Sequence, residues 1–376
     1  MNRIILSGGV EQVYKRLFTA LILLCFFVSH SCAIDVSAKS AILYEPETKT
    51  VLFEKDSKTE RPIASTTKIM TALVALQHAD LSETVTVPRA VVGTEGTSMY
   101  LKENEKLSVS DLLYGLLLRS GNDAASALAY HIGKGDTGRF TEMMNRTARD
   151  IGMKNSCFKN PSGLPEEGHF STAYDMALLA SRALENPLFS EIVATKEKTV
   201  AGRLLSNHNK MLRLYEGANG VKTGFTKAAG RCLVSSAERN GMTLVAVTLS
   251  APDDWDDHTE MLDYGFDNFA LKKYSSENIE LPELPVAGGT LDAVSVNVCG
   301  ELTFLTEKSK ENGVKTEIIL PRFVYAPVTS GDVVGEIRYV LNGENLGSLS
   351  VVSCDTVTEY KSKSFIRKIL DFFGRK

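Results

Sequence analysis

Two patterns of apolar residues divide the chain. Up to about residue 274, apolar side chains recur mainly at helical spacing, as in residues 66–78, which contain no glycine or proline. Further on the period changes to two, and Val294, Val296 and Val298 alternate with polar residues. A helix-rich part followed by a strand-rich part predicts an α+β protein with two domains.

Other segments refine this division. Apolar runs on either side of Asn240-Gly241, at residues 232–237 and 243–249, predict a β-hairpin within the helix-rich part. Further helices are expected over residues 112–118, 123–129 and 259–269. In the second part, two predicted strands over residues 334–341 and 348–353 flank a turn at residues 342–347. The segment from Glu280 to Pro285, with its two prolines, predicts a linker.

Length and charge limit the class of protein. The chain of 376 residues exceeds what one hydrophobic core usually encloses, which agrees with two domains. Its net charge of −4 disfavours general nucleic-acid binding, and no glycine-rich phosphate loop occurs. We therefore expect neither a nucleic-acid partner nor a nucleotide.

The first 33 residues predict a signal peptide. Lys15 and Arg16 precede an apolar run at residues 17–28, and small residues at 31–33 suit cleavage after Ala33. A lipoprotein site at Cys32 lacks the expected aliphatic residue before it. A retained anchor is disfavoured because the apolar run is shorter than the roughly 20 residues that span a bilayer. We therefore expect the protein to be exported and to work outside the cytoplasm.

The C-terminal residues 360–376 predict an amphipathic helix. Six apolar side chains between Phe365 and Phe373 alternate with lysines and arginines, so that one face is apolar and another basic. The segment is too short to span a bilayer, but it suits the surface of an anionic membrane. The alternative is a terminal helix that packs on the second domain.

Three short motifs stand in a fixed order in the helix-rich part. They are Ser65-Thr66-Thr67-Lys68, Ser120-Gly121-Asn122 and Lys222-Thr223-Gly224. Each motif alone is most simply a capping turn or a surface lysine. Together they indicate a serine nucleophile that uses lysine as its base.

The first motif suits acyl transfer. Ser65 is expected to be the first residue of a buried helix, and Lys68, three residues later, shares its face. The positive end of such a helix would lie where oxyanion charge develops. A lysine is a base at neutral pH only if burial or a second cation lowers its pKa from about 10.4, and Lys222 is the expected neighbour.

The other two motifs add polar groups. Ser120 and Asn122 are expected on a tight turn between two helices. Lys222 and Thr223 are expected at the start of an edge strand, where they can hold a substrate carboxylate. Gly224 lets a substrate backbone approach that strand.

The sequence around these motifs resembles a known group of enzymes, the penicillin-recognising serine acyltransferases. The similarity is greatest to the serine D-alanyl-D-alanine carboxypeptidases, the low-molecular-mass penicillin-binding proteins, at residues 64–73, 118–125, 160–164 and 220–226. It implies a β-lactamase/transpeptidase-like catalytic domain, with an antiparallel sheet flanked by helices, at residues 34–275. A small all-β domain would follow at residues 280–358.

The resemblance also implies the chemistry of the first two motifs. Ser65 would attack the carbonyl between the last two D-alanines of a peptidoglycan stem pentapeptide and form an acyl-enzyme, while Lys68 takes the proton. Ser120 would relay a proton to the leaving amine. Asn122 would hold the substrate amide and orient Lys68.

The third motif would bind the substrate's end. The resemblance implies that Lys222 and Thr223, followed by Gly224, hold the terminal carboxylate. The backbone amides of Ser65 and Phe225 would form the oxyanion hole. No cofactor is implied, and β-lactam antibiotics would acylate the same serine.

Three alternatives remain open. A class A β-lactamase would need a Glu-x-x-x-Asn motif between the second and third motifs. None occurs, since Glu166 and Glu167 lie in a loop that matches the carboxypeptidases. An endopeptidase acting on peptidoglycan cross-links would use the same residues as a carboxypeptidase. A non-catalytic penicillin-binding sensor is disfavoured by the intact motifs.

Cysteine and histidine positions carry less information. Cys299 and Cys354 are the one pair that could form a disulfide in an exported protein, and free thiols are the simpler alternative. The histidines show no zinc-ligand spacing, so we expect no metal. The acidic segment from Asp253 to His258 is expected to be a solvated loop and the start of a helix.

Overall fold

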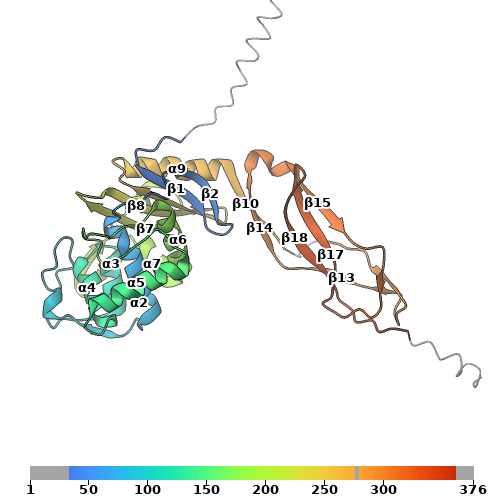
Figure 1. The fold of residues 1–376 in the computed structure, drawn as a ribbon, viewed down its shortest axis with the longest axis horizontal. Coiled ribbons are helices and arrows are strands. Elements are labelled where there is room, and N and C mark those ends of the chain that lie inside the picture. The colour runs from blue at the N-terminus through green and yellow to red at the C-terminus, as the bar shows by residue number, and fades with distance from the viewer. Residues whose placement is uncertain (1–33, 276–278, 361–376) are drawn as a thin grey trace, which may run out of the picture. The chain divides into compact units, whose positions relative to one another are not determined.

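The computed structural model describes residues 34–275 and 279–360. A five-stranded antiparallel sheet lies at the centre of the first domain (Figure 1). Its order is β2-β1-β9-β8-β7, which makes β7 an edge strand. The strands are β1 (Ser40–Glu45), β2 (Thr50–Lys55), β7 (Ala218–Thr226), β8 (Gly230–Arg239) and β9 (Met242–Leu249).

Helices cover both faces of this sheet. Helix α9 packs on one face against β8 and β9, while α6 and α7 pack on the other face with the remaining helices around them (Figure 1). The helices are α2 (Lys68–His78), α3 (Val109–Leu117), α4 (Asn122–Ile132), α5 (Thr137–Ile151), α6 (Ala173–Leu184), α7 (Pro187–Ala194), α8 (Met211–Leu214) and α9 (Asp254–Asn268). The smaller elements are η1 (Ala64–Thr67), η2 (Arg89–Val91), β3 (Thr84–Thr86), β4 (Lys106–Ser108), β5 (Glu197–Val200) and β6 (Arg203–Ser206).

Local sequence explains where several helices begin. Ser108 and Asp111 form a reciprocal capping box at the start of α3. Asn186 accepts hydrogen bonds from the first turn of α7, and Pro187 occupies the first helical position, where no amide hydrogen is needed. Helix α2 is buried along most of its length, so the first motif stands in the core and not on the surface.

The predicted elements of this domain are largely confirmed. Strands β8 and β9 form the expected hairpin around Asn240, and α9 continues from the acidic segment as expected. One prediction is wrong in kind: Ser65 is not the first residue of an α-helix but lies in the 3₁₀ turn η1, which leads into α2 at Lys68. Lys222 lies in the middle of β7 and not at its start, because the strand already begins at Ala218.

The second domain consists of β-strands, as predicted. Its sheets have the orders β13-β18-β17-β15 and β12-β11-β16, and β10, which lies within the range predicted for the first domain, pairs with β14 of the second. The strands are β10 (Phe269–Tyr274), β11 (Leu284–Ala287), β12 (Ala293–Val294), β13 (Val296–Cys299), β14 (Leu302–Glu307), β15 (Val314–Ile319), β16 (Val324–Tyr325), β17 (Val333–Leu341) and β18 (Glu344–Ser353); η3 spans Lys308–Gly313.

Details of this domain differ from the prediction. Val294 and Val296 belong to different sheets, and Leu284 and Pro285, expected in a linker, lie in β11. The turn between β17 and β18 is only Asn342-Gly343, because residues 344–347 already pair with β17. Asn-Gly is sufficient for a two-residue hairpin turn.

The disulfide considered between Cys299 and Cys354 is absent, and both thiols are free and exposed. The register of β13 and β18 explains this, because Cys299 faces Ser350 and the chain at Cys354 bonds to Ser295. Four residues along a strand separate the two positions by about 13 Å, whereas disulfide-linked Cα atoms lie within about 7 Å.

Two further findings concern the part of the chain described by the structure. No helix there is long and apolar enough to cross a membrane. No group of histidine, cysteine and acidic side chains there could hold a metal ion. The predicted signal peptide and the predicted amphipathic helix fall almost entirely outside the described residues.

Candidate active site

The turn η1 and helix α2 bring Ser65 and Lys68 together. Lys68 Nζ lies 3.0 Å from Ser65 Oγ. The lysine is completely buried, whereas Ser65 is partly exposed. The two residues therefore pair as predicted, although through a 3₁₀ turn and not through an α-helix.

Two further contacts fix the Lys68 amine. Nζ donates hydrogen bonds to Asn122 Oδ1 at 2.7 Å and to the Ser162 carbonyl oxygen at 2.6 Å. A neutral amine has two N–H donors and one lone pair. With both donors engaged by these oxygens, the lone pair of neutral Lys68 points to the Ser65 hydroxyl, as a general base requires.

The surroundings of Lys68 favour this neutral form. Burial, followed by the charge of Lys222, holds the pKa of Lys68 well below its ordinary value of 10.5, while Asp123 acts in the opposite sense. Burial also lowers the pKa of Lys222, to about 7. The predicted like-charge pair is thus present, and desolvation is the larger cause at Lys68.

The turn of the second motif holds Asn122 in place. Ser120 adopts the left-handed conformation with φ of 62° and is buried, and α4 starts at Asn122. The amide nitrogen of the Asn122 side chain donates to the Glu95 carbonyl oxygen at 2.6 Å. Its side-chain oxygen is thereby directed to Lys68.

Asp123 is a structural residue that the motif analysis missed. Its buried carboxylate accepts hydrogen bonds from the backbone of Met99 and Leu101 and from the Ser98 hydroxyl. These bonds fasten the segment at residues 98–101 beside the second motif. Sequence gave no signal for this role beyond an acidic residue at the start of a helix.

The loop at residues 160–164 forms the other wall of the site. The Pro161 carbonyl accepts from Thr71 Oγ1 at 2.6 Å, which fastens the loop to α2. Gly163 has φ of 83°, and a side chain there would place a Cβ 1.9 Å from the Ala64 carbonyl oxygen. Only glycine fits this contact, so the loop can bring the Ser162 carbonyl to Lys68.

The third motif packs against the turn that carries Ser65. A Cβ added at Gly224 would lie 3.1 Å from the backbone nitrogens of Ser65 and Thr66. Lys222 is buried and donates to the Thr223 carbonyl oxygen at 2.7 Å. Phe225 is 66% exposed, so we expect its backbone and not its side chain to take part in the site. The free edge of β7 therefore runs beside Ser65.

Two basic residues near Lys222 were not predicted. His208 Nε2 lies 3.4 Å from Arg119 Nη1, and the backbone of His208 donates to the Leu118 carbonyl oxygen. Burial, and then the charges of Lys222 and Arg119, lower the pKa of His208. Arg119 directly precedes the second motif, which is the only signal that sequence offered.

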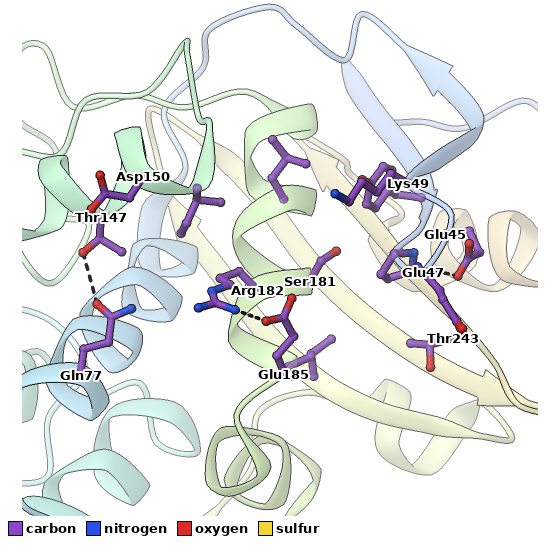
Figure 2. A pocket seen from close by; sticks show the side chains of 15 residues that line it. Glu45, Glu47, Lys49, Gln77, Thr147, Asp150, Ser181, Arg182, Glu185 and Thr243 are labelled. Carbon is purple, nitrogen blue, oxygen red and sulfur yellow. Dashed lines mark hydrogen bonds and ion pairs between the residues drawn. The ribbon is translucent and has the colours of Figure 1, made fainter. Parts of the chain in front are cut away.

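A large cavity in the described part of the chain lies elsewhere. It has a volume of about 820 Å³ and is bordered by the β1–β2 turn and by residues of α2, α5 and α6. Figure 2 shows that its charged side chains are partly paired with each other, as in the Arg182–Glu185 ion pair. Gln77, on its border, lies nine residues after Lys68, about 14 Å along the helix. None of the motif residues lines it.

Comparison with known proteins decides the family. Residues 27–253 match the family model described as D-alanyl-D-alanine carboxypeptidase. This chain belongs to that family. Residues 269–359 match a second model, the C-terminal domain of penicillin-binding protein 5, which accounts for the β domain. The predicted catalytic fold, followed by a β domain, and the predicted serine carboxypeptidase activity are confirmed at the level of the family.

Individual relatives extend over most of the chain. The carboxypeptidase DacF of Bacillus subtilis is 32% identical over 347 residues, which cover 89% of this chain and 89% of DacF. The carboxypeptidase DacC of Escherichia coli is 32% identical over 357 residues, 90% of this chain and 88% of DacC. The structure of penicillin-binding protein 5 from Haemophilus influenzae has a TM-score of 0.71 at 29% identity and covers 86% of this chain and 98% of that one.

Proposed function

We propose that Ser65 is the nucleophile of this carboxypeptidase and that neutral Lys68 is its general base. The observation that carries the proposal is the set of three contacts at Lys68 Nζ. The oxygens of Asn122 and Ser162 accept its two N–H groups, and the third contact is with the Ser65 hydroxyl that is to be deprotonated. The family activity supplies the substrate, a peptidoglycan stem peptide that ends in D-alanyl-D-alanine.

Acylation then follows from this geometry. As Ser65 Oγ attacks the penultimate carbonyl, its proton passes to Lys68, and negative charge develops on the carbonyl oxygen. We assign the backbone amides of Ser65 and Phe225 as the oxyanion hole, because the contact at Gly224 sets β7 against the Ser65 amide. Collapse of this intermediate releases D-alanine, whose amine takes a proton relayed from Lys68 through Ser120.

Hydrolysis completes the cycle. Water attacks the ester on Ser65, Lys68 accepts a proton from that water, and Ser65 regains a proton as the shortened peptide leaves. Asn122 keeps Lys68 in place in both halves of the reaction and offers its amide to the substrate. We assign Lys222 and Thr223 to the terminal carboxylate, with Arg119 and His208 as nearby basic groups.

The reaction itself is tested with defined peptides. The full-length chain should release D-alanine from a stem pentapeptide and should cleave a cross-linked muropeptide dimer far more slowly. Faster cleavage of the dimer would identify the enzyme as an endopeptidase. The same active-site residues would serve that reaction, so the result would correct the substrate and not the mechanism.

The pKa values predict a bell-shaped pH profile for kcat/KM. On the acid side the rate should rise as Lys68 loses its proton, and above about pH 7 it should fall as Lys222 loses the charge that binds the carboxylate. Arginine stays charged, so Lys222→Arg should lose the alkaline limb between pH 7 and 10. Peptide hydrolysis followed from pH 5 to 10 checks this, and an alkaline limb that persists in the variant would contradict it.

We also propose how the enzyme reaches its substrate. Residues 1–33 would act as the signal peptide, and residues 34–275 and 280–358 would be the exported catalytic and β domains. Residues 360–376 would attach the enzyme to the outer face of the cytoplasmic membrane. Support comes from the sequence of the tail, which places apolar and basic side chains on different faces of a helix.

Charged substitutions on the apolar face of the tail should abolish membrane attachment. Phe365→Glu, Ile369→Glu and Phe372→Glu together place carboxylates at helical spacing on that face. The full-length chain should sediment with vesicles rich in phosphatidylglycerol, and the triple variant should not. A variant that still sediments would show that another part of the chain holds the membrane. Replacing Lys102 and Lys106 by glutamate provides a control for added charge.

A further inference from the structure

A second cavity opens beside the catalytic serine. It has a volume of about 340 Å³, and its border includes Ile63, Gly163, Glu167, His169 and Thr226. Ile63 lies two residues before Ser65, and Thr226 lies two residues after Gly224. The cavity is therefore next to both the nucleophile and the strand along which the substrate lies. None of the roles assigned above uses it.

The direction of the substrate leads into this cavity. The terminal carboxylate is assigned to Lys222 and Thr223, and the scissile carbonyl to Ser65 and Phe225. A peptide that passes through these two points lies along the free edge of β7. The residues that precede its acylating D-alanine then lie towards Thr226. Each residue advances about 3.3 Å, so the residue before the acylating D-alanine lies level with Thr226 and the cavity.

The walls of the cavity suit a long aliphatic side chain. Leu164 and Pro165 contribute accessible apolar surface, while Ile63 on the border is fully buried. His169 closes one side without a free ring nitrogen, because Nδ1 accepts from the Lys159 backbone and Nε2 bonds to Thr67 Oγ1 at 2.8 Å. Because both of its ring nitrogens are engaged, His169 forms part of the cavity wall and does not bind the substrate through its ring nitrogens.

The opening of the cavity is acidic. Glu166 and Glu167 both border it and are both exposed. One oxygen of Glu166 accepts from Asn160 at 2.9 Å, which ties this carboxylate to the loop that presents Ser162 to Lys68. Among the ion pairs of the described residues, none involves Glu166 or Glu167. Neither carboxylate therefore forms an ion pair that a substrate ammonium would have to displace.

We propose that this cavity binds the diamino-acid side chain of the stem peptide, with its aliphatic part against Leu164 and Pro165 and its terminal ammonium beside Glu166 and Glu167. The proposal rests on the proposed function, since it uses the substrate direction set by Lys222 and Ser65. The shared chemistry is a primary amine at the end of an aliphatic chain, as in both lysine and diaminopimelate. Diaminopimelate carries an additional carboxylate, for which two cations are available: Lys159, whose Nζ would lie 3.8 Å from a Cβ at Gly168, and the exposed Lys227 between Thr226 and Ala228.

The test compares peptides that differ only in this amine. The full-length enzyme should hydrolyse Nα-acetyl-L-lysyl-D-alanyl-D-alanine with a kcat/KM about fivefold to tenfold above that of the norleucyl analogue, and high salt should reduce the preference. The double variant Glu166→Gln/Glu167→Gln should hydrolyse the two peptides at equal rates. Glu142→Gln, an exposed change on α5, should keep the preference.

The outcomes separate this proposal from the function on which it rests. No release of D-alanine from either peptide would overturn the proposed function. Equal rates in the wild type, or a preference that survives in the double variant, would overturn the cavity assignment alone. A diaminopimelyl peptide should likewise lose its advantage over norleucine in the double variant, and an advantage retained there would show recognition of its carboxylate instead. Benzylpenicillin lacks the amine and should acylate all variants equally, which confirms an intact site.

Discussion

Replacement of Ser65 by alanine should abolish peptide hydrolysis. Without the hydroxyl no acyl-enzyme forms, and the groups that remain around the site, the amine of Lys68 and the backbone amides, cannot replace a covalent intermediate. Loss of a nucleophile of this kind lowers kcat by about 10⁴-fold or more. The measurement is D-alanine release from diacetyl-L-lysyl-D-alanyl-D-alanine by the full-length chain.

A second serine provides the matched control. Ser181 lies on α6 at the distant cavity of Figure 2, where its hydroxyl donates to the Ala177 carbonyl oxygen at 2.7 Å. Ser181→Ala should therefore retain wild-type activity. If Ser65→Ala kept more than a tenth of the wild-type rate, another residue would have to be the nucleophile.

Replacement of Lys68 by arginine should cause the second largest loss. Arginine offers N–H donors for Asn122 and the Ser162 carbonyl, but it stays charged in proteins and, unlike neutral Lys68, presents no lone pair to Ser65. A missing general base costs about a thousandfold in rate. The loss should appear both in peptide hydrolysis and in the acylation rate with benzylpenicillin, because both substrates acylate Ser65 and Lys68 accepts the proton in that shared step.

The control for this change is Lys154→Arg, at an exposed position between α5 and α6. It should leave both rates unchanged. Near-ultraviolet circular dichroism of Lys68→Arg tests whether the buried site still packs. A correctly folded Lys68→Arg variant that lost less than tenfold would show that a different group removes the Ser65 proton.

The sequence predicted which polar side chains would meet, because the identity of a motif residue indicates the chemistry that it can perform. Lys68 lies within hydrogen-bond distance of both Ser65 and Asn122, as the first two motifs indicated. Apolar periodicity likewise predicted α2 and the hairpin of β8 and β9. What periodicity could not show was the 3₁₀ turn at Ser65, since four residues of turn and the start of a helix have the same pattern.

Contacts made by backbone atoms were not predictable in the same way. Any residue could supply the carbonyl that Ser162 offers to Lys68, and only the fit of Gly163 against Ala64 brings it there. Asp123 and His208 owe their roles to segments far away in the sequence. The lone disulfide candidate failed for a similar reason, because strand register decides whether two cysteines meet.

The most direct test of the central claim is the mass of the enzyme after reaction with benzylpenicillin. We expect the full-length chain to gain the mass of one intact penicillin, the adduct to persist for many minutes, and peptide mapping to place it on Ser65. Ser65→Ala should gain nothing. An adduct on another residue, or rapid turnover of penicillin without a detectable adduct, would contradict the account.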